Sequence, residues 1–74
     1  MNVQNIELVI EKDESGMWGR VNYNDNLIIE QADNLDDLES KLKMLLKDFE
    51  GVAPESIKFD LRKLSVQFRL SLLL

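Results

Sequence analysis

Carboxylates are the residues of this 74-residue chain best able to do chemistry, because the chain contains neither His nor Cys. Without those two residue types, the common pairs of nucleophile and general base cannot be assembled. The densest carboxylate group comprises Asp33, Asp36, Asp37 and Glu39. Carboxylates bind divalent cations, but neighbouring positions at a helix start point in divergent directions. We therefore expect no catalytic residues, no metal site and no cofactor.

The stretch NYNDN, residues 22 to 26, presents alternating oxygen-bearing side chains, as a calcium-binding loop does. Leu27 stands where such a loop needs its turning glycine, and Asp33 stands where a closing Glu is required. Asn and Asp tolerate left-handed backbone conformations. The stretch therefore predicts a hairpin turn.

Trp18, the only tryptophan, is the aromatic residue best suited to bind a partner. It shares a predicted strand face with Arg20, and Trp and Arg are enriched among residues that anchor interfaces. Trp18 could instead cover a sheet edge or pack under the C-terminal segment, since large aromatics dominate small cores. We predict Trp18 and Arg20 as partner-binding residues, together with the helix-start acids Asp36 and Asp37.

The charge of the chain is uneven. The net charge is −5, but residues 1 to 56 carry five Lys and Arg against thirteen Asp and Glu, a balance of −8. Residues 57 to 74 carry four basic residues and one acidic residue, a balance of +3. The acidic part suggests a basic partner, and ordinary solubility is the alternative explanation.

Four strand patterns and one helix pattern position these residues. Apolar residues alternate in NIELVIEK, MWGRVNY and SIKFDL, and LIIEQ is a short β-branched run. Asn34 is a good N-cap with Asp37 three residues later, and Gly51 supplies the stop, so a helix is expected at about 35–50. Its apolar stripe is Leu35, Leu38, Leu42, Leu45, Leu46 and Phe49.

Residues 1–74 are thus expected to form a single α+β domain, β-β-β-α-β, with one helix packed on an antiparallel sheet. A change of alternation indicates a turn or bulge near Arg62 and Lys63. The tail, residues 62–74, could form a fifth strand, or its leucine-rich segment could pair with a second subunit and make a homo-oligomer. The first residues resemble no secretory signal and no stretch suits a membrane span, so we expect a cytoplasmic protein without membrane contact.

Residues 13 to 38, DESGMWGRVNYNDNLIIEQADNLDDL, preceded by IELVIEKD, resemble the HicB-like antitoxin domain. The matching features are an acidic and basic strand end, a Gly turn, the aromatic Trp18, a short third strand and an acidic helix start. The resemblance implies a reduced ribonuclease H-like fold without its catalytic carboxylates. It also implies a non-catalytic antitoxin of a toxin–antitoxin system that masks a small basic ribonuclease toxin.

The chain departs from the HicB-like pattern in two places, and three other functions are compatible with its residues. NYNDN replaces the family's usual Pro- and Gly-containing loop, and too few residues follow Asp60 for a helix-turn-helix, which argues against direct DNA binding. A nucleic-acid-binding regulator would instead use the cations Lys58, Arg62, Lys63 and Arg69. The other two alternatives are a homo-oligomeric interaction domain and a carboxylate-only metal nuclease.

Overall fold

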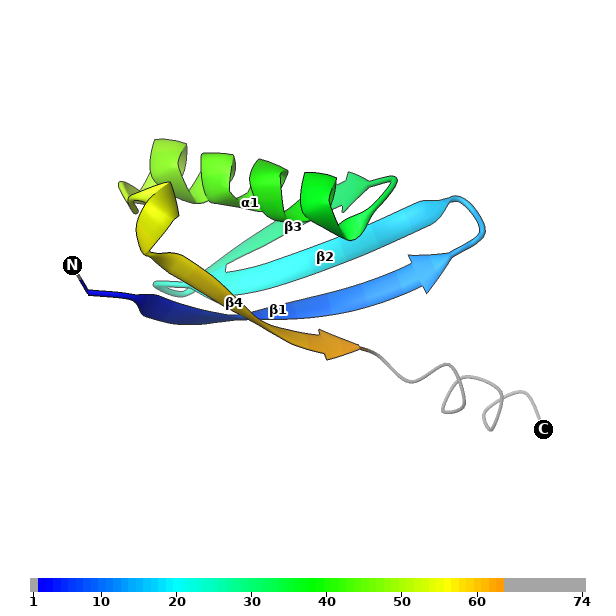
Figure 1. Ribbon diagram of the computed structural model, residues 1–74, viewed down its shortest axis with the longest axis horizontal. Coiled ribbons are helices and arrows are strands. Elements are labelled where there is room, and N and C mark those ends of the chain that lie inside the picture. The colour runs from blue at the N-terminus through cyan, green and yellow to red at the C-terminus, as the bar shows by residue number, and fades with distance from the viewer. Residues whose placement is uncertain (1, 64–74) are drawn as a thin grey trace.

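The computed structural model describes residues 2–63 of the chain. In them, one four-stranded sheet carries a long helix on one face (Figure 1). The elements, in chain order, are β1 (Gln4–Asp13), β2 (Gly16–Tyr23), β3 (Asn26–Ala32), α1 (Leu35–Glu50), the 3-10 helix η1 (Pro54–Ser56) and β4 (Ile57–Lys63). This order confirms the predicted α+β fold. No helix within residues 2–63 has the length and apolar character needed to cross a membrane.

Both hairpin turns use residue types that favour them. In the β2–β3 turn, Asn24 and Asp25 have positive φ angles of 49° and 66°, as a two-residue type I′ turn requires. In the β1–β2 turn, Asp13 Oδ1 accepts hydrogen bonds from the Ser15 backbone N–H at 2.9 Å and from Ser15 Oγ at 2.7 Å. The NYNDN stretch is therefore a hairpin turn, as its residues predicted.

Helix α1 begins and ends where the sequence predicted. Asn34 Oδ1 accepts a hydrogen bond from the Asp37 backbone N–H at 2.9 Å, which satisfies one of the amides exposed at the helix start. At the other end Gly51 adopts a left-handed φ of 69°, and its N–H donates to the Lys47 carbonyl at 3.1 Å. Glycine adopts this conformation without a Cβ clash, so it ends the helix well.

The strand order is β3-β2-β1-β4, and β4 runs parallel to β1. The expectation of an antiparallel sheet is therefore correct for β1, β2 and β3 and wrong for β4, so the sheet is mixed. The reason is that α1 carries the chain back across the sheet. The next strand then starts where β1 starts, and Ile57 pairs with Gln4.

Neither the turn nor the bulge predicted near Arg62 and Lys63 is found at these two residues. Both residues continue β4, in which Arg62 pairs with Val9 and Lys63 with Ile10. The predicted fifth strand and the pairing of the leucine-rich segment with a second subunit concern residues outside the described range.

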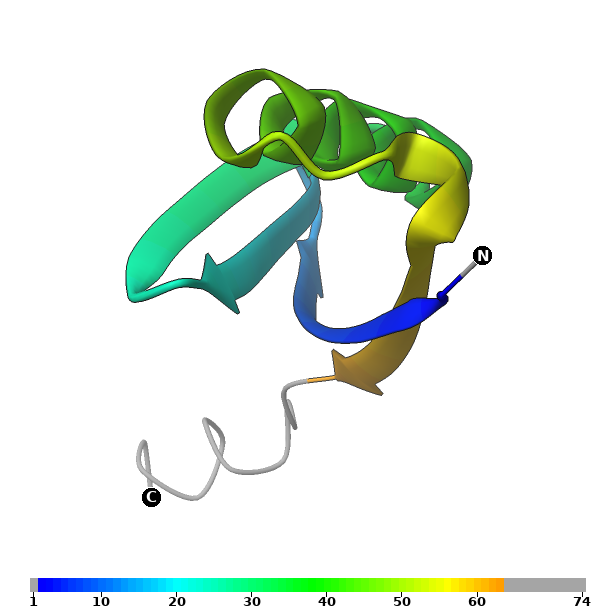
Figure 2. The same ribbon diagram turned by 90° about the vertical axis from the view of Figure 1, so that its left-hand side faces the viewer.

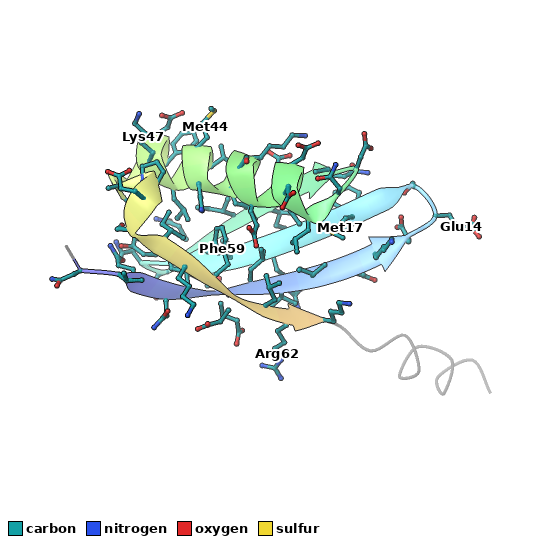
Figure 3. The ribbon with its side chains drawn as sticks, in the orientation of Figure 1. Glu14, Met17, Met44, Lys47, Phe59 and Arg62 are labelled. Atoms are coloured by element: carbon teal, nitrogen blue, oxygen red, sulfur yellow. The ribbon has the colours of Figure 1, made fainter. Side chains whose placement is uncertain are left out.

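The core lies between α1 and one face of the sheet. Its buried apolar residues are Ile6, Leu8, Ile10, Val21, Ala32, Leu38, Leu42, Leu46, Val52 and Ile57. Met17 and Phe59 pack against them from the sheet, whereas Arg62 projects from the other face (Figure 3). Figure 2 shows that α1 covers one face alone. Among the described residues, no element covers the opposite face.

The last residue of the predicted apolar stripe is not buried in the core. Phe49 belongs to the apolar stripe by its spacing, yet its side chain is 74% exposed. Phe49 shares a shallow hollow with Leu27 and Ile29 of β3, which is the last strand at this side of the sheet. The stripe loses its cover there because no further described strand lies beyond β3.

Candidate partner-binding surface

The face of the sheet opposite α1 is called the open face below. Strand alternation and register place on it the side chains of Glu7, Val9, Glu11, Trp18, Arg20, Asn22, Leu27, Ile29, Gln31, Lys58, Asp60 and Arg62. Trp18 is 40% exposed, and Leu27 and Ile29 are 56% and 55% exposed. The open face therefore presents an exposed Trp, an Arg and aliphatic side chains, and aromatic residues and Arg are enriched in the cores of protein interfaces.

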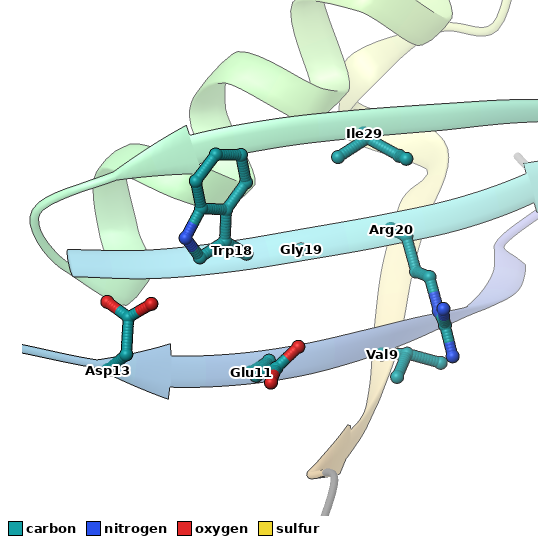
Figure 4. A pocket seen from close by; sticks show the side chains of 7 residues that line it. All are labelled: Val9, Glu11, Asp13, Trp18, Gly19, Arg20 and Ile29. Atoms are coloured by element: carbon teal, nitrogen blue, oxygen red, sulfur yellow. The ribbon is translucent and has the colours of Figure 1, made fainter. Parts of the chain in front are cut away.

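A shallow pocket of about 240 Å³ surrounds Trp18 on the open face (Figure 4). Its lining residues are Val9, Glu11, Asp13, Trp18, Gly19, Arg20 and Ile29. The indole lies on the Asp13 side of the pocket and the Arg20 guanidinium on the Val9 side. Apolar walls between opposite charges suit one side chain of a partner better than a whole small-molecule substrate, which needs a larger and deeper cavity.

The charges of the open face nearly balance. Arg20, Lys58 and Arg62 stand among Glu7, Glu11 and Asp60. Arg62 Nη1 lies 3.7 Å from Glu7 Oε2, with the two side chains 71% and 58% exposed. An ion pair this exposed contributes little to stability. The open face by itself therefore gives no strong preference for a cationic partner.

The predicted residues Asp36 and Asp37 lie in the other layer, on the first turn of α1, and both are exposed. Asp37 takes part in the helix cap, because its Oδ2 accepts a hydrogen bond from Asn34 Nδ2 at 3.2 Å. Neither aspartate lines the Trp18 pocket. The structure thus brings Trp18 and Arg20 together and places the two aspartates apart from them.

The two aspartates nevertheless share one end of the molecule with other acids. The β1–β2 turn and the start of α1 lie at the same end (Figure 1), because Met17 at the start of β2 pairs with Ala32 at the end of β3. The exposed acids gathered there, called the acidic end below, are Asp13, Glu14, Asp33, Asp36 and Asp37. One exposed cation, Lys12, lies at the same end, because it pairs with Met17, and five acids outnumber it. Asp13 also lines the Trp18 pocket, so the acidic end adjoins that pocket.

The cations of the nucleic-acid alternative do not share one face. Lys58 and Arg62 lie on the open face and Lys63 on the helix side, since strand residues alternate. Arg69 lies outside the described residues. Within residues 2–63, no group of three or more Asp or Glu residues is placed to hold a metal ion.

A comparison of the chain with protein-family models, curated proteins and solved structures finds no match. The HicB-like resemblance therefore remains a prediction, carried by the residues on which it was based.

Sequence reasoning missed three exposed apolar residues at the β3 edge and three acids of the acidic end. Leu27, Ile29 and Phe49 form an apolar margin along β3. The signal for Leu27 and Ile29 was the run LII, because three successive apolar residues in a strand cannot all face one core. Asp13, Glu14 and Asp33 join the acidic end only through the hairpin register, which no local pattern shows.

Proposed function

We propose that this protein is a cytoplasmic, non-catalytic binding module of the HicB-like antitoxin type, which masks a small basic ribonuclease toxin. The observation that supports this function best is the acidic end next to the Trp18 pocket. The HicB-like motifs supply the class of partner.

The acidic end would act at long range. An excess of carboxylates at one end of a small protein raises the rate at which a cationic protein associates with it in the correct orientation. The attraction weakens as salt rises, because the Debye length falls from ~30 Å at 0.01 M to ~8 Å at 0.15 M ionic strength.

The Trp18 pocket would act at short range. An indole can hold an apolar or cationic side chain of the toxin through burial and cation–π contact. The Arg20 guanidinium can donate hydrogen bonds to carbonyl or carboxylate oxygens of the same partner. A toxin held in this way would be inhibited by coverage of its own RNA-binding surface, which needs no reaction on this chain.

The test begins with recovery of the partner from the native host on the tagged protein, at low and moderate salt. The captured small basic protein is then purified and assayed for RNA cleavage with and without this protein. Stoichiometric inhibition is expected. A captured protein that does not cleave RNA, or whose cleavage is unaffected, would contradict the proposal.

Matched charge reversals then locate the surface. Asp33→Lys with Asp36→Lys changes the acidic end, whereas Asp48→Lys with Glu55→Lys makes the same change in net charge elsewhere, and all four residues are exposed. We expect the first pair to raise the toxin Kd at least ~10-fold at low salt and the control pair less than ~3-fold. Trp18→Ala should raise the Kd by ~30-fold or more, as expected of an anchor residue that the partner buries. Equal effects of the two charge pairs would show that net charge alone matters.

A further inference from the structure

Strand β3 forms one edge of the described sheet, so alternate backbone groups of β3 point away from β2. Tyr23 and Asn26 flank a two-residue turn and therefore form a hydrogen-bonded pair. Hydrogen bonding alternates along an antiparallel pair. The backbone N–H and C=O groups of Leu27, Ile29 and Gln31 consequently point outward.

At Gln31 this edge is blocked by side chains. The Gln31 carbonyl accepts a hydrogen bond from Lys41 Nζ at 2.9 Å, and the Gln31 N–H donates to Glu30 Oε1 at 3.0 Å. Both contacts agree with the outward orientation of Gln31. Proteins commonly use charged side chains in this way to prevent unwanted strand pairing.

At Leu27 and Ile29 no such block is present among the described residues. Both side chains are more than half exposed on the open face, and Phe49 is 74% exposed on the helix side of the same edge. An open strand edge with apolar side chains on both sides is a template for another strand. The short segment of residues 27–29 is therefore open to pairing with another strand.

We propose that this edge of β3 is a self-association surface, where residues 27 to 29 pair antiparallel with the same residues of a second copy. Ile28 would lie on the two-fold axis. Leu27 would stand opposite Ile29 of the second copy, and the outward N–H and C=O groups of these two residues would bond to each other. The two-fold axis would generate the same pair of hydrogen bonds a second time. The two Phe49 side chains would cover this junction on the helix side. This surface lies away from the acidic end but shares Ile29 with the Trp18 pocket, and the inference goes beyond the proposed function.

The position of the block favours a second copy over an unrelated strand. In the symmetric register, Gln31 stands opposite Asp25 of the second copy, which is a turn residue. The pairing therefore ends where the free edge ends. Lys41, which donates a hydrogen bond to the Gln31 carbonyl, would also approach the Asp25 carboxylate of the second copy. The two-fold symmetry would repeat this contact between opposite charges.

The first test is the mass of the full-length protein in solution from micromolar to millimolar concentration, by light scattering or sedimentation. A concentration-dependent dimer is expected. Leu27→Lys should raise the dimer dissociation constant at least ~10-fold, because it places a charge opposite an apolar side chain. Met44→Lys is the control, since Met44 is 63% exposed and projects from the outer side of α1 (Figure 3).

A monomer at every concentration would overturn the proposal. A dimer that Leu27→Lys leaves unchanged would overturn it too, because association would then use another part of the chain. Far-UV circular dichroism of both Lys variants verifies that they are folded, so a lost dimer can be assigned to the edge.

The second test is the register, which the cysteine-free chain allows. Leu27→Cys and Ile29→Cys chains carrying different tags are mixed and oxidised. Opposed residues in this register have Cα atoms ~5.5 Å apart, within the range of ~4.4–6.8 Å that a disulfide spans. Disulfides between the two different chains should form several-fold faster than disulfides within either population. Equal rates of formation of all three disulfide-linked products would reject the symmetric register.

Discussion

Gly19 of β2 has the least room for a side chain among the three glycines of the chain. A Cβ atom there would stand 2.8 Å from Leu38 Cδ2 and 3.0 Å from Leu8 Cδ1. Both leucines are fully buried, so their methyl groups have little room to move. The missing side chain of Gly19 allows α1 to approach β2 closely.

Gly19→Ala should therefore destabilise the fold by about 1–2 kcal/mol, because overpacking a core outweighs the entropy that Ala saves in the unfolded chain. The measurement is urea unfolding followed by circular dichroism. Gly51→Ala is the comparison, because no atom lies within 4 Å of its added Cβ and its cost comes from the left-handed φ of 69°. Gly51→Asn should recover part of that loss. Unchanged stability in Gly19→Ala would contradict the packing argument.

At the scale of elements, the start of α1 depends on one side chain. Asn34 accepts from the Asp37 N–H and donates to the Asp37 carboxylate. The same turn places Asp36 and Asp37 near the positive end of the helix dipole, where negative charge is favourable. These local effects explain the two acids at this position independently of any binding role.

Asn34→Ala should lower stability by about 1 kcal/mol, because the Asp37 amide loses its side-chain acceptor. In a domain of this size, that corresponds to a Tm decrease of ~4–8 °C. Thermal unfolding monitored at 222 nm measures it. Asn34→Ser retains an acceptor and should recover most of the loss. Equal Tm values for the Ala and Ser variants would show that the cap contributes little.

At the scale of the whole molecule, the sheet has a centre and two edges. β1 pairs with β2 and with β4, and its residues Ile6, Leu8 and Ile10 are buried. β3 pairs with β2 alone among the described strands. Local opening should therefore be rarest at β1.

Native-state hydrogen exchange should show the slowest amides in β1 and fast exchange at Leu27 and Ile29 in dilute protein, since their N–H groups point outward. Self-association through β3 should slow exchange at these two amides as the concentration rises. NMR measurement of the exchange rates at two protein concentrations distinguishes protection within the monomer from protection by self-association. Uniform protection across β1 and β3 in dilute protein would contradict the assignment of β3 as an open edge.

Elements with local causes can be predicted from the amino-acid sequence. The left-handed turn at Asn24 and Asp25, the cap at Asn34 and the stop at Gly51 each arise from backbone sterics or hydrogen bonds within a few residues. Alternation along β2 likewise placed Trp18 and Arg20 on one face. The expected fold class followed because these elements can bury their apolar faces in few ways.

Contacts between distant parts of the chain depend on the three-dimensional arrangement of the elements. The parallel pairing of β4, the exposure of Phe49 and the free edge at Leu27 depend on the order of strands in the sheet. The acidic end depends on register, which brings Asp13 from one turn near Asp33 from another segment. Alternation and capping act over a few residues, whereas strand order and register follow from how the whole chain buries its apolar side chains.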